Sequence, residues 1–145
     1  MRSLHLLFVP LFFLATINWQ PDFATATRIA REKQQLILLN FSGSDWCGPC
    51  IRMRKEIFED PTFAAMADSS LVLYNADFPR NIKNQLQADL KKQNEALADK
   101  YNPQGKFPFT VLLNADGKLI KSWEGLPDEK AAEFTKSVKS ICDAN

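Results

Sequence analysis

The sequence predicts a mixed three-layer α/β domain, in which helices cover both faces of a central sheet. Two short and almost unbroken apolar runs, at residues 36–41 and 71–78, have the pattern of strands buried on both faces. The turn sequence Asn114-Ala115-Asp116-Gly117 is a strong hairpin signal, and it adds antiparallel strands. Because segments with helical spacing precede the hairpin and alternate with the apolar runs, a mixed sheet between helices is the favoured fold class.

The composition is that of one globular domain. The chain has 145 residues, of which 46% are hydrophobic and 11% aromatic, and this is enough for a single core. The 18 Lys+Arg against 17 Asp+Glu give a net charge of +1, which argues against a broad surface for nucleic acid or anionic membrane. We therefore expect a monomer that has no nucleic-acid partner.

Residues 1–17 are expected to lie outside the fold. Arg2 followed by an apolar run over residues 4–17 matches the start of a secretory signal. The run is shorter than the ~20 residues that a bilayer-spanning helix needs, and Pro10 interrupts it. No clear cleavage site follows, so an uncleaved signal-anchor is the alternative, and contact with a membrane is expected only in that case. The predicted organisation is a signal at 1–17 and a domain at 18–145, in the periplasm or secreted.

The only histidine of the chain, His5, falls within that N-terminal segment. A domain without histidine cannot use Ser-His-Asp or Cys-His catalysis, and it cannot form His-containing zinc or copper sites. We expect neither a metal nor a cofactor.

The other predicted elements follow from helix-start residues and apolar spacing. Asp22 can cap a helix, and Pro49 suits the first turn of another. In chain order, these elements are an extended piece at 17–19, helices at 22–35 and from about Pro49 to Pro61, a helical turn at 62–67, a long polar helix at 80–101, strands at 110–113 and 118–123, and a last helix from Pro127.

The segment Trp46-Cys47-Gly48-Pro49-Cys50 joins a buried strand to the start of a helix. Two cysteines separated by two residues in a first helical turn can bring their sulfurs within bonding distance. Unpaired amide groups at a helix N-terminus stabilise a thiolate at Cys47, and thiols placed in this way have a pKa of about 3.5–7.5. Cys50 is placed to attack a mixed disulfide formed at Cys47. The motif predicts a redox couple, with Cys47 as the nucleophile and Cys50 as the resolving thiol.

Three other interpretations of the cysteine pair remain, and one of them is chance occurrence of the motif in a protein of another function. Half of a zinc site would need two further ligands, and only Cys142 is left in the domain. A purely structural disulfide would stabilise weakly, because closing so small a ring removes little chain entropy. Cys142 shares a helix face with Phe134 and Val138, so we expect a small buried hydrophobe there; an exposed thiol that forms intermolecular disulfides is the alternative.

The segment Ile37–Cys50 resembles the active-site region of the thioredoxin superfamily, in particular of secreted bacterial thioredoxin-like proteins. Phe107-Pro108-Phe109-Thr110 matches the cis-proline loop of that family. The resemblance implies a thioredoxin fold, and it implies that Pro108 faces the disulfide and pairs with an extended substrate segment. It further implies that Phe107 tunes redox behaviour and that Trp46, Gly48 and Pro49 support the site. A trans proline at the start of a strand is the alternative for Pro108.

The chain departs from the family at one chemically important position. Thioredoxins carry a buried acid on the strand before the motif, and the corresponding residue here is Asn40. Asparagine cannot exchange a proton at neutral pH, so Cys50 must use water or another acid, such as Asp45 or Glu56. Asp45 itself is expected to be a solvated loop residue or a cap. The basic residues at 52, 54 and 55 are expected to be a solvated helix face.

The resemblance implies an extracytoplasmic thiol–disulfide oxidoreductase. The Gly48-Pro49 dipeptide resembles that of the reductants in the superfamily, which favours reduction of protein disulfides with electrons from an upstream donor. A dithiol oxidase or disulfide isomerase is the first alternative, and the reduction potential of the cysteine pair distinguishes it. A non-catalytic module that binds an extended partner beside Pro108 is the second, and its function would survive Cys47→Ser.

Overall fold

The computed structural model describes residues 16–145. Residues 1–15 hold most of the predicted signal, and they lie outside the described residues, so this prediction stays an expectation. Over the described range, none of the helices is both long enough and apolar enough to span a membrane.

Four strands form one mixed sheet in the order β2-β1-β3-β4. β1 runs parallel to β2 and antiparallel to β3, and β3 pairs antiparallel with β4. The elements are α1 (Phe23–Lys33), β1 (Leu36–Ser42), α2 (Gly48–Met53), the π-helical turn η1 (Arg54–Phe58), α3 (Pro61–Ser70), β2 (Leu71–Asp77), the 3-10 turn η2 (Ile82–Asn84), α4 (Ala88–Tyr101), β3 (Phe109–Leu113), β4 (Leu119–Glu124) and α5 (Ala131–Asp143).

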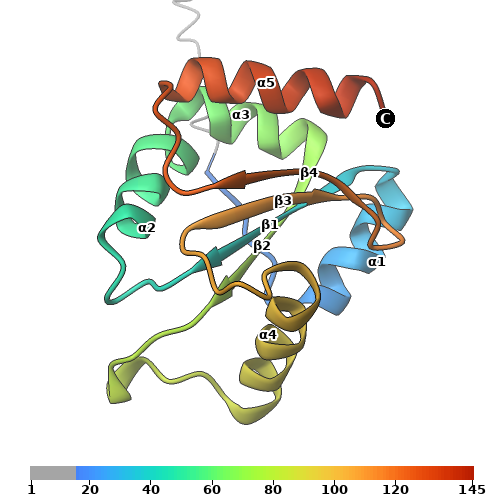
Figure 1. Cartoon of the computed structure of the whole chain (residues 1–145). Coiled ribbons are helices and arrows are strands. Elements are labelled where there is room, and N and C mark those ends of the chain that lie inside the picture. The colour runs from blue at the N-terminus through green and yellow to red at the C-terminus, as the bar shows by residue number, and fades with distance from the viewer. Residues whose placement is uncertain (1–15) are drawn as a thin grey trace, which may run out of the picture.

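Each face of the sheet carries its own hydrophobic core. Residues of β1 alternate between the two cores: Leu36 and Leu38 pack on one side, and Ile37, Leu39 and Phe41 pack on the other. α3 and α5 cover the first side, whereas α1 and α4 cover the second (Figure 1). The predicted three-layer α/β architecture, a thioredoxin fold, is therefore confirmed. β1 is buried along its whole length, as its apolar run predicted.

The predicted strands agree with the structure to within one residue at each end, and the predicted capping of α1 is confirmed. The Asp22 carboxylate accepts a hydrogen bond from the Thr25 backbone N–H at 2.7 Å. Gln34, with a φ of 54°, ends this helix in the left-handed conformation.

Three shorter predictions need correction. The extended piece at 17–19 is not a strand, because it forms a single bridge between Trp19 and Leu73. The helical turn at 62–67 is a ten-residue helix, α3, which the Asp60 side chain caps. The last helix begins at Ala131, four residues after Pro127.

The predicted helix over residues 80–101 is wrong in its first third. The chain first makes the short turn η2, and α4 begins only at Ala88. Asp45 accepts hydrogen bonds from the backbone N–H groups of Arg80 and Asn81, each at 2.9 Å. Residues 78–87 are here called the arm. The contacts with the distant loop at Asp45 hold the arm in an irregular conformation, which the spacing of apolar residues within the arm does not predict. Ile82, which falls within the predicted helix, is 86% exposed.

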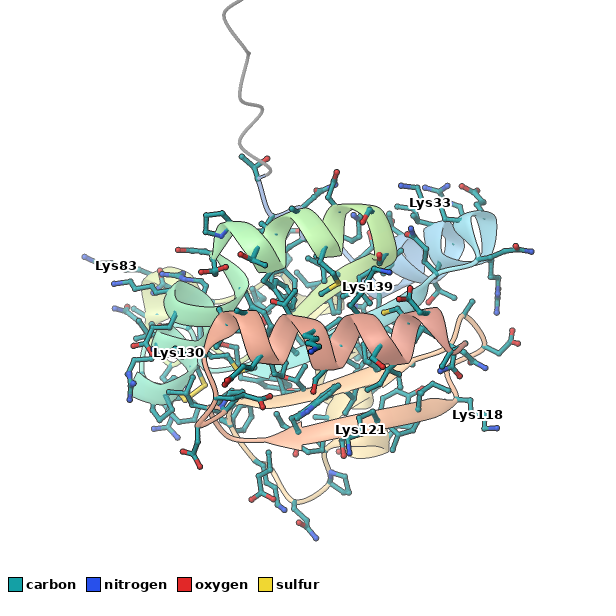
Figure 2. All side chains as sticks on the ribbon, turned by 90° about the horizontal axis from the view of Figure 1, so that it is seen from above. Lys33, Lys83, Lys118, Lys121, Lys130 and Lys139 are labelled. Atoms are coloured by element: carbon teal, nitrogen blue, oxygen red, sulfur yellow. A yellow bond between two sulfur atoms is a disulfide. The ribbon has the colours of Figure 1, made fainter. Side chains whose placement is uncertain are left out.

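Lysine side chains are spread around the molecule. The six that Figure 2 labels, Lys33, Lys83, Lys118, Lys121, Lys130 and Lys139, point outward from several sides and do not gather on one face.

Tyr74 on β2 anchors α4 to the sheet. Its hydroxyl donates to Asn94 Oδ1 at 2.6 Å and accepts from Gln93 Nε2 at 2.7 Å. Burial raises the pKa of Tyr74 to about 12. The neutral phenol is therefore favoured in the folded state, and its contribution to stability is complete below pH ~10 and is lost as the pH rises toward 12.

We expect Tyr74→Phe to lower the free energy of unfolding at pH 7 by about 1–3 kcal/mol, because the buried Asn94 side chain loses its donor. The difference between the two proteins should shrink between pH 10 and 12, where wild-type Tyr74 ionises on unfolding. Urea denaturation of both proteins at pH 7, 10 and 11 measures this. A difference in the free energy of unfolding that stays constant between pH 7 and 11 would contradict the raised pKa of Tyr74 in the folded protein.

Candidate active site

The cysteine motif lies where β1 passes into α2. The Cys47 backbone N–H donates to the Gly43 carbonyl at 2.9 Å, and Cys47 is the N-cap residue of α2. Pro49 occupies the first helical turn, where its missing N–H costs no hydrogen bond. The chain therefore folds locally as its sequence predicted, with both cysteines in one turn.

Cys47 and Cys50 form a disulfide, with their Cα atoms 5.2 Å apart. Both cysteines are buried, at 5% and 3% exposure, whereas Gly48 and Pro49 between them are exposed. The exposed fractions of the two cysteines are nearly equal, so they do not show which cysteine carries negative charge more easily. Hydrogen bonding does distinguish the two. The Cys50 backbone N–H points at Cys47 Sγ, 3.3 Å away, and such a donor favours negative charge on Cys47.

The loop before β3 carries the residues that the resemblance singled out. The Phe107–Pro108 peptide bond is cis. Pro108 is buried, and its carbonyl accepts a hydrogen bond from the Gly125 N–H at 2.9 Å. The Phe107 ring meets the Trp46 ring edge to face, with centroids 5.5 Å apart. The structure thus brings the predicted residues of the cysteine motif and of this loop into contact through Trp46 and Phe107.

The arm completes an aromatic cluster around Trp46 that the sequence did not indicate. Trp46 Nε1 donates to the Phe78 carbonyl at 2.7 Å, and the Phe78 ring lies 5.5 Å from that of Phe107. The Arg80 guanidinium carbon lies 3.7 Å from the centroid of the Trp46 ring, within cation–π distance. Phe78 and Arg80 were missed because the sequence pattern assigned Arg80 to a helix and Phe78 to a strand end.

Gly43 is a further residue of the site that the sequence did not indicate. A Cβ atom at this position would lie 2.2 Å from Trp46 Cε2, so only glycine leaves room for the indole ring. Gly48 has no such neighbour, because a Cβ there would meet nothing within 4 Å.

We expect Gly43→Ala to destabilise the protein by about 1–3 kcal/mol and to change the tryptophan fluorescence, because the Trp46 ring must move. Gly48→Ala is the matched control and should change the free energy of unfolding much less. Denaturation curves followed by fluorescence and by circular dichroism report both quantities. Equal effects of the two substitutions would contradict the close packing at Gly43.

Asn40 lies on β1, where thioredoxins have a buried acid, and its side chain is fully engaged with neutral groups. Asn40 Nδ2 donates to Asn75 Oδ1 at 2.9 Å, and Asn40 Oδ1 accepts from Thr110 Oγ1 at 2.9 Å. The residue is 4% exposed and lines the same cavity as Cys50. Position 40 therefore borders the same cavity as Cys50 and carries no charge.

The two acids that were considered as proton carriers for Cys50 bind other groups. The Arg80 backbone N–H, followed by the Asn84 side chain, holds the pKa of Asp45 below its usual value, so Asp45 acts as a cap for the arm. The hydrogen bond from the Arg52 guanidinium likewise lowers the pKa of Glu56. Asp45 is a half-buried cap, and Glu56 is an exposed ion-pair partner of Arg52. The predictions of a capping role for Asp45 and of a solvated basic helix face are met.

Cys142 on α5 is a free thiol. Its burial is intermediate between the two alternatives expected from the sequence, a buried hydrophobe and an exposed thiol. It is half-buried and packs against the core on the α3–α5 side. Burial raises the pKa of the Cys142 thiol, which lowers its thiolate fraction at neutral pH.

The fold and the cysteine pair together define a thiol–disulfide oxidoreductase of thioredoxin fold. The sequence model of the thioredoxin-like domain family matches residues 23–141, and the chain belongs to that family. It is 31% identical over 126 residues to the disulfide bond reductase DsbH of Chlamydia pneumoniae, an alignment that spans 87% of this chain and 73% of that protein.

A second relative is the thioredoxin-related protein DsbJ of Chlamydia pneumoniae, which is 28% identical over 131 residues. That alignment spans 90% of this chain but only 36% of DsbJ. Among solved structures, a DsbH oxidoreductase superposes with a TM-score of 0.84 at 26% identity, covering 99% of this chain and 96% of the other. A thioredoxin from Thermus thermophilus, with a TM-score of 0.65 at 17% identity and 87% coverage of both chains, shares the fold.

Proposed function

We propose that the protein reduces protein disulfides outside the cytoplasm. Cys47 as a thiolate attacks one sulfur of a substrate disulfide, and the other substrate sulfur leaves as a thiolate. Cys50 as a thiolate then attacks Cys47 Sγ and releases the remaining substrate sulfur. Two electrons pass to the substrate, and Cys47–Cys50 becomes the disulfide. An upstream dithiol donor returns two electrons to the pair.

The observation that carries this proposal is the hydrogen bond from the Cys50 N–H to Cys47 Sγ, which favours charge on Cys47 over Cys50. The similarity to a protein named a disulfide bond reductase supports the reducing direction. The Gly48-Pro49 dipeptide supports it as well. The cis-proline loop, with Phe107 and Pro108, and the exposed edge at Gly48 and Pro49 are the proposed place where an extended substrate segment binds.

Alkylation tests the roles of the two cysteines. Iodoacetamide at pH ~7 should label Cys47 of the reduced protein much faster than Cys50 or Cys142, because the thiolate is the reactive species. Peptide mass spectrometry after short exposures measures the three rates. Faster labelling of Cys50 would reverse the assignment.

The proposed location rests on the signal-like residues 1–17. Mass spectrometry of the protein purified from its source should show a mature N-terminus between about Ala15 and Trp19, or an intact chain in the membrane fraction if the segment is an anchor. An intact Met1 in a soluble cytoplasmic fraction would contradict export.

A further inference from the structure

A cavity of about 330 Å³, lined both by polar side chains and by Trp19, Ile51 and Phe58, borders Cys50. Its polar lining comes from β1, β2, the loop after β1 and the helical segment that follows the motif, and includes Asn40, Asn75, Ser44, Asp77 and Arg54. A volume of this size with several hydrogen-bonding side chains accommodates a number of water molecules. Cys50, although only 3% exposed, therefore borders a space large enough to hold water.

Asp77, the last residue of β2, is the one carboxylate among the residues that line this cavity in the described part of the chain. Its Oδ1 accepts from the backbone N–H groups of Ser44 at 2.9 Å and of Phe78 at 3.0 Å. Its Oδ2 accepts from Ser44 Oγ at 2.5 Å. The carboxylate is half-buried and fixed in place, and the Ser44 hydroxyl that it binds also belongs to the cavity wall.

The residues that would otherwise serve Cys50 are unsuited to accept its proton. Asn40 occupies the position of the family's buried acid, but its amide has no proton to exchange at neutral pH. Asp45 is committed to the backbone of the arm, and Glu56 is committed to Arg52. Neither of these two carboxylates lines the cavity beside Cys50.

We propose that the Asp77 carboxylate accepts the proton of the Cys50 thiol, through water in this cavity, when Cys50 attacks the mixed disulfide. This inference rests on the proposed role of Cys50 as the resolving thiol. The Cys50 S–H bond breaks, its proton passes to Asp77, and the sulfur electron pair forms the bond to Cys47 Sγ. The bond between Cys47 and the substrate sulfur breaks, and the substrate leaves as a thiolate. Asp77 then returns the proton to solvent.

Two charged side chains from neighbouring elements line cavities that Asp77 also lines. Arg54 lines the cavity beside Cys50 and pairs with Glu59 at 3.4 Å, and Lys91 on α4 lines a smaller cavity of about 100 Å³ that Asp77 also lines. Both are cations, so the charged side chains that share these cavities with Asp77 are opposite in sign to its carboxylate.

The test isolates the resolving step with 5,5′-dithiobis(2-nitrobenzoate) as the probe, in full-length protein carrying Cys142→Ser. Reduced protein mixed with one equivalent of probe releases one coloured thiolate when Cys47 attacks, and a second when Cys50 attacks. We expect Asp77→Asn to leave the first phase unchanged and to slow the second phase about a hundredfold at pH 6, the lower end of what a positioned proton acceptor contributes.

The pH profile of the second phase separates proton transfer from a structural effect. In the presence of Asp77 the rate should be nearly level between pH 6 and 8, whereas in Asp77→Asn it should rise about tenfold per pH unit, as expected when hydroxide replaces the carboxylate. An unchanged or faster second phase in Asp77→Asn would overturn the proposal, because removal of a merely repulsive charge lowers the pKa of a thiol.

Two further measurements keep the proposal testable if Asp77→Asn disturbs the loop. In the wild-type protein the second phase, and not the first, should slow about twofold in D₂O; equal isotope effects would contradict the proposal. Asp77→Glu, which keeps a carboxylate at the same position, should retain a second-phase rate at pH 6 at least about tenfold above that of Asp77→Asn. A rate for Asp77→Glu as low as that of Asp77→Asn would show that Asp77 acts through loop structure. A wild-type protein that gives no second phase would instead refute the role of Cys50, and with it the proposed function.

Discussion

Replacing Cys47 with Ser is expected to lower the rate of insulin disulfide reduction by at least about a thousandfold, because a serine hydroxyl is not ionised at neutral pH and cannot attack a disulfide. Cys50→Ser should block turnover at the next step. Cys47 in that variant still attacks, but no thiol releases the substrate, so a mixed disulfide accumulates. Non-reducing electrophoresis and mass spectrometry of the trapped species identify the linked cysteine.

Cys142→Ser is the matched control, because Cys142 is a half-buried thiol on α5 that belongs to another part of the fold. Its activity should equal that of the wild type. If the mixed disulfide were trapped only in Cys47→Ser, the nucleophile would be Cys50. If Cys47→Ser retained full function in the source organism, the protein would be a binding module and not a reductase.

The second large effect is expected for Asn40→Asp. The side chain at position 40 is 4% exposed and lies among Asn75, Thr110 and the Cys50 cavity. An aspartate loses the donor to Asn75 Oδ1 and places a charge against the neutral Asn75 and Thr110 side chains. Arg54, the cation that lines the same cavity, is paired with Glu59. The oxidised variant should be less stable than the wild type by about 1–3 kcal/mol at pH 8–9.

The pH dependence of this loss has a definite sign. Burial raises the pKa of such a carboxyl above its unfolded value, so the folded variant prefers the protonated acid. The destabilisation should therefore grow as the pH rises through the folded pKa and recover at lower pH. Chemical denaturation of both oxidised proteins between pH 6 and 9 measures the difference. Parallel stability curves would mean that a charge at position 40 is solvated, contrary to its observed burial.

The parts of the fold that were predictable from sequence are those fixed by local patterns. β1 and β2 appeared as apolar runs because both faces of each strand pack against helices. The start of α1 was predictable because Asp22 binds the amide of Thr25, only three residues away. The cysteine pair was visible for the same reason, since its geometry depends on one helical turn.

The features that were missed depend on contacts between distant residues. The arm departs from the predicted helix because Asp45 binds the amides of Arg80 and Asn81, 35 and 36 residues away. No periodicity in the arm itself reports such a contact. Asp77 likewise sits at the end of an apolar run, where nothing in the sequence marks it as the carboxylate that shares a cavity with Cys50.

The reduction potential of the Cys47–Cys50 couple tests the proposed direction of electron flow most directly. Equilibration of the full-length protein with dithiothreitol buffers of defined ratio, followed by alkylation and mass spectrometry, gives the fraction oxidised at each potential. A value near about −270 mV, close to that of thioredoxin, is the result that a protein-disulfide reductase predicts. A value near about −120 mV, typical of a strong dithiol oxidant, would place the equilibrium about five powers of ten toward the dithiol form of the protein, and it would contradict the proposed reductase.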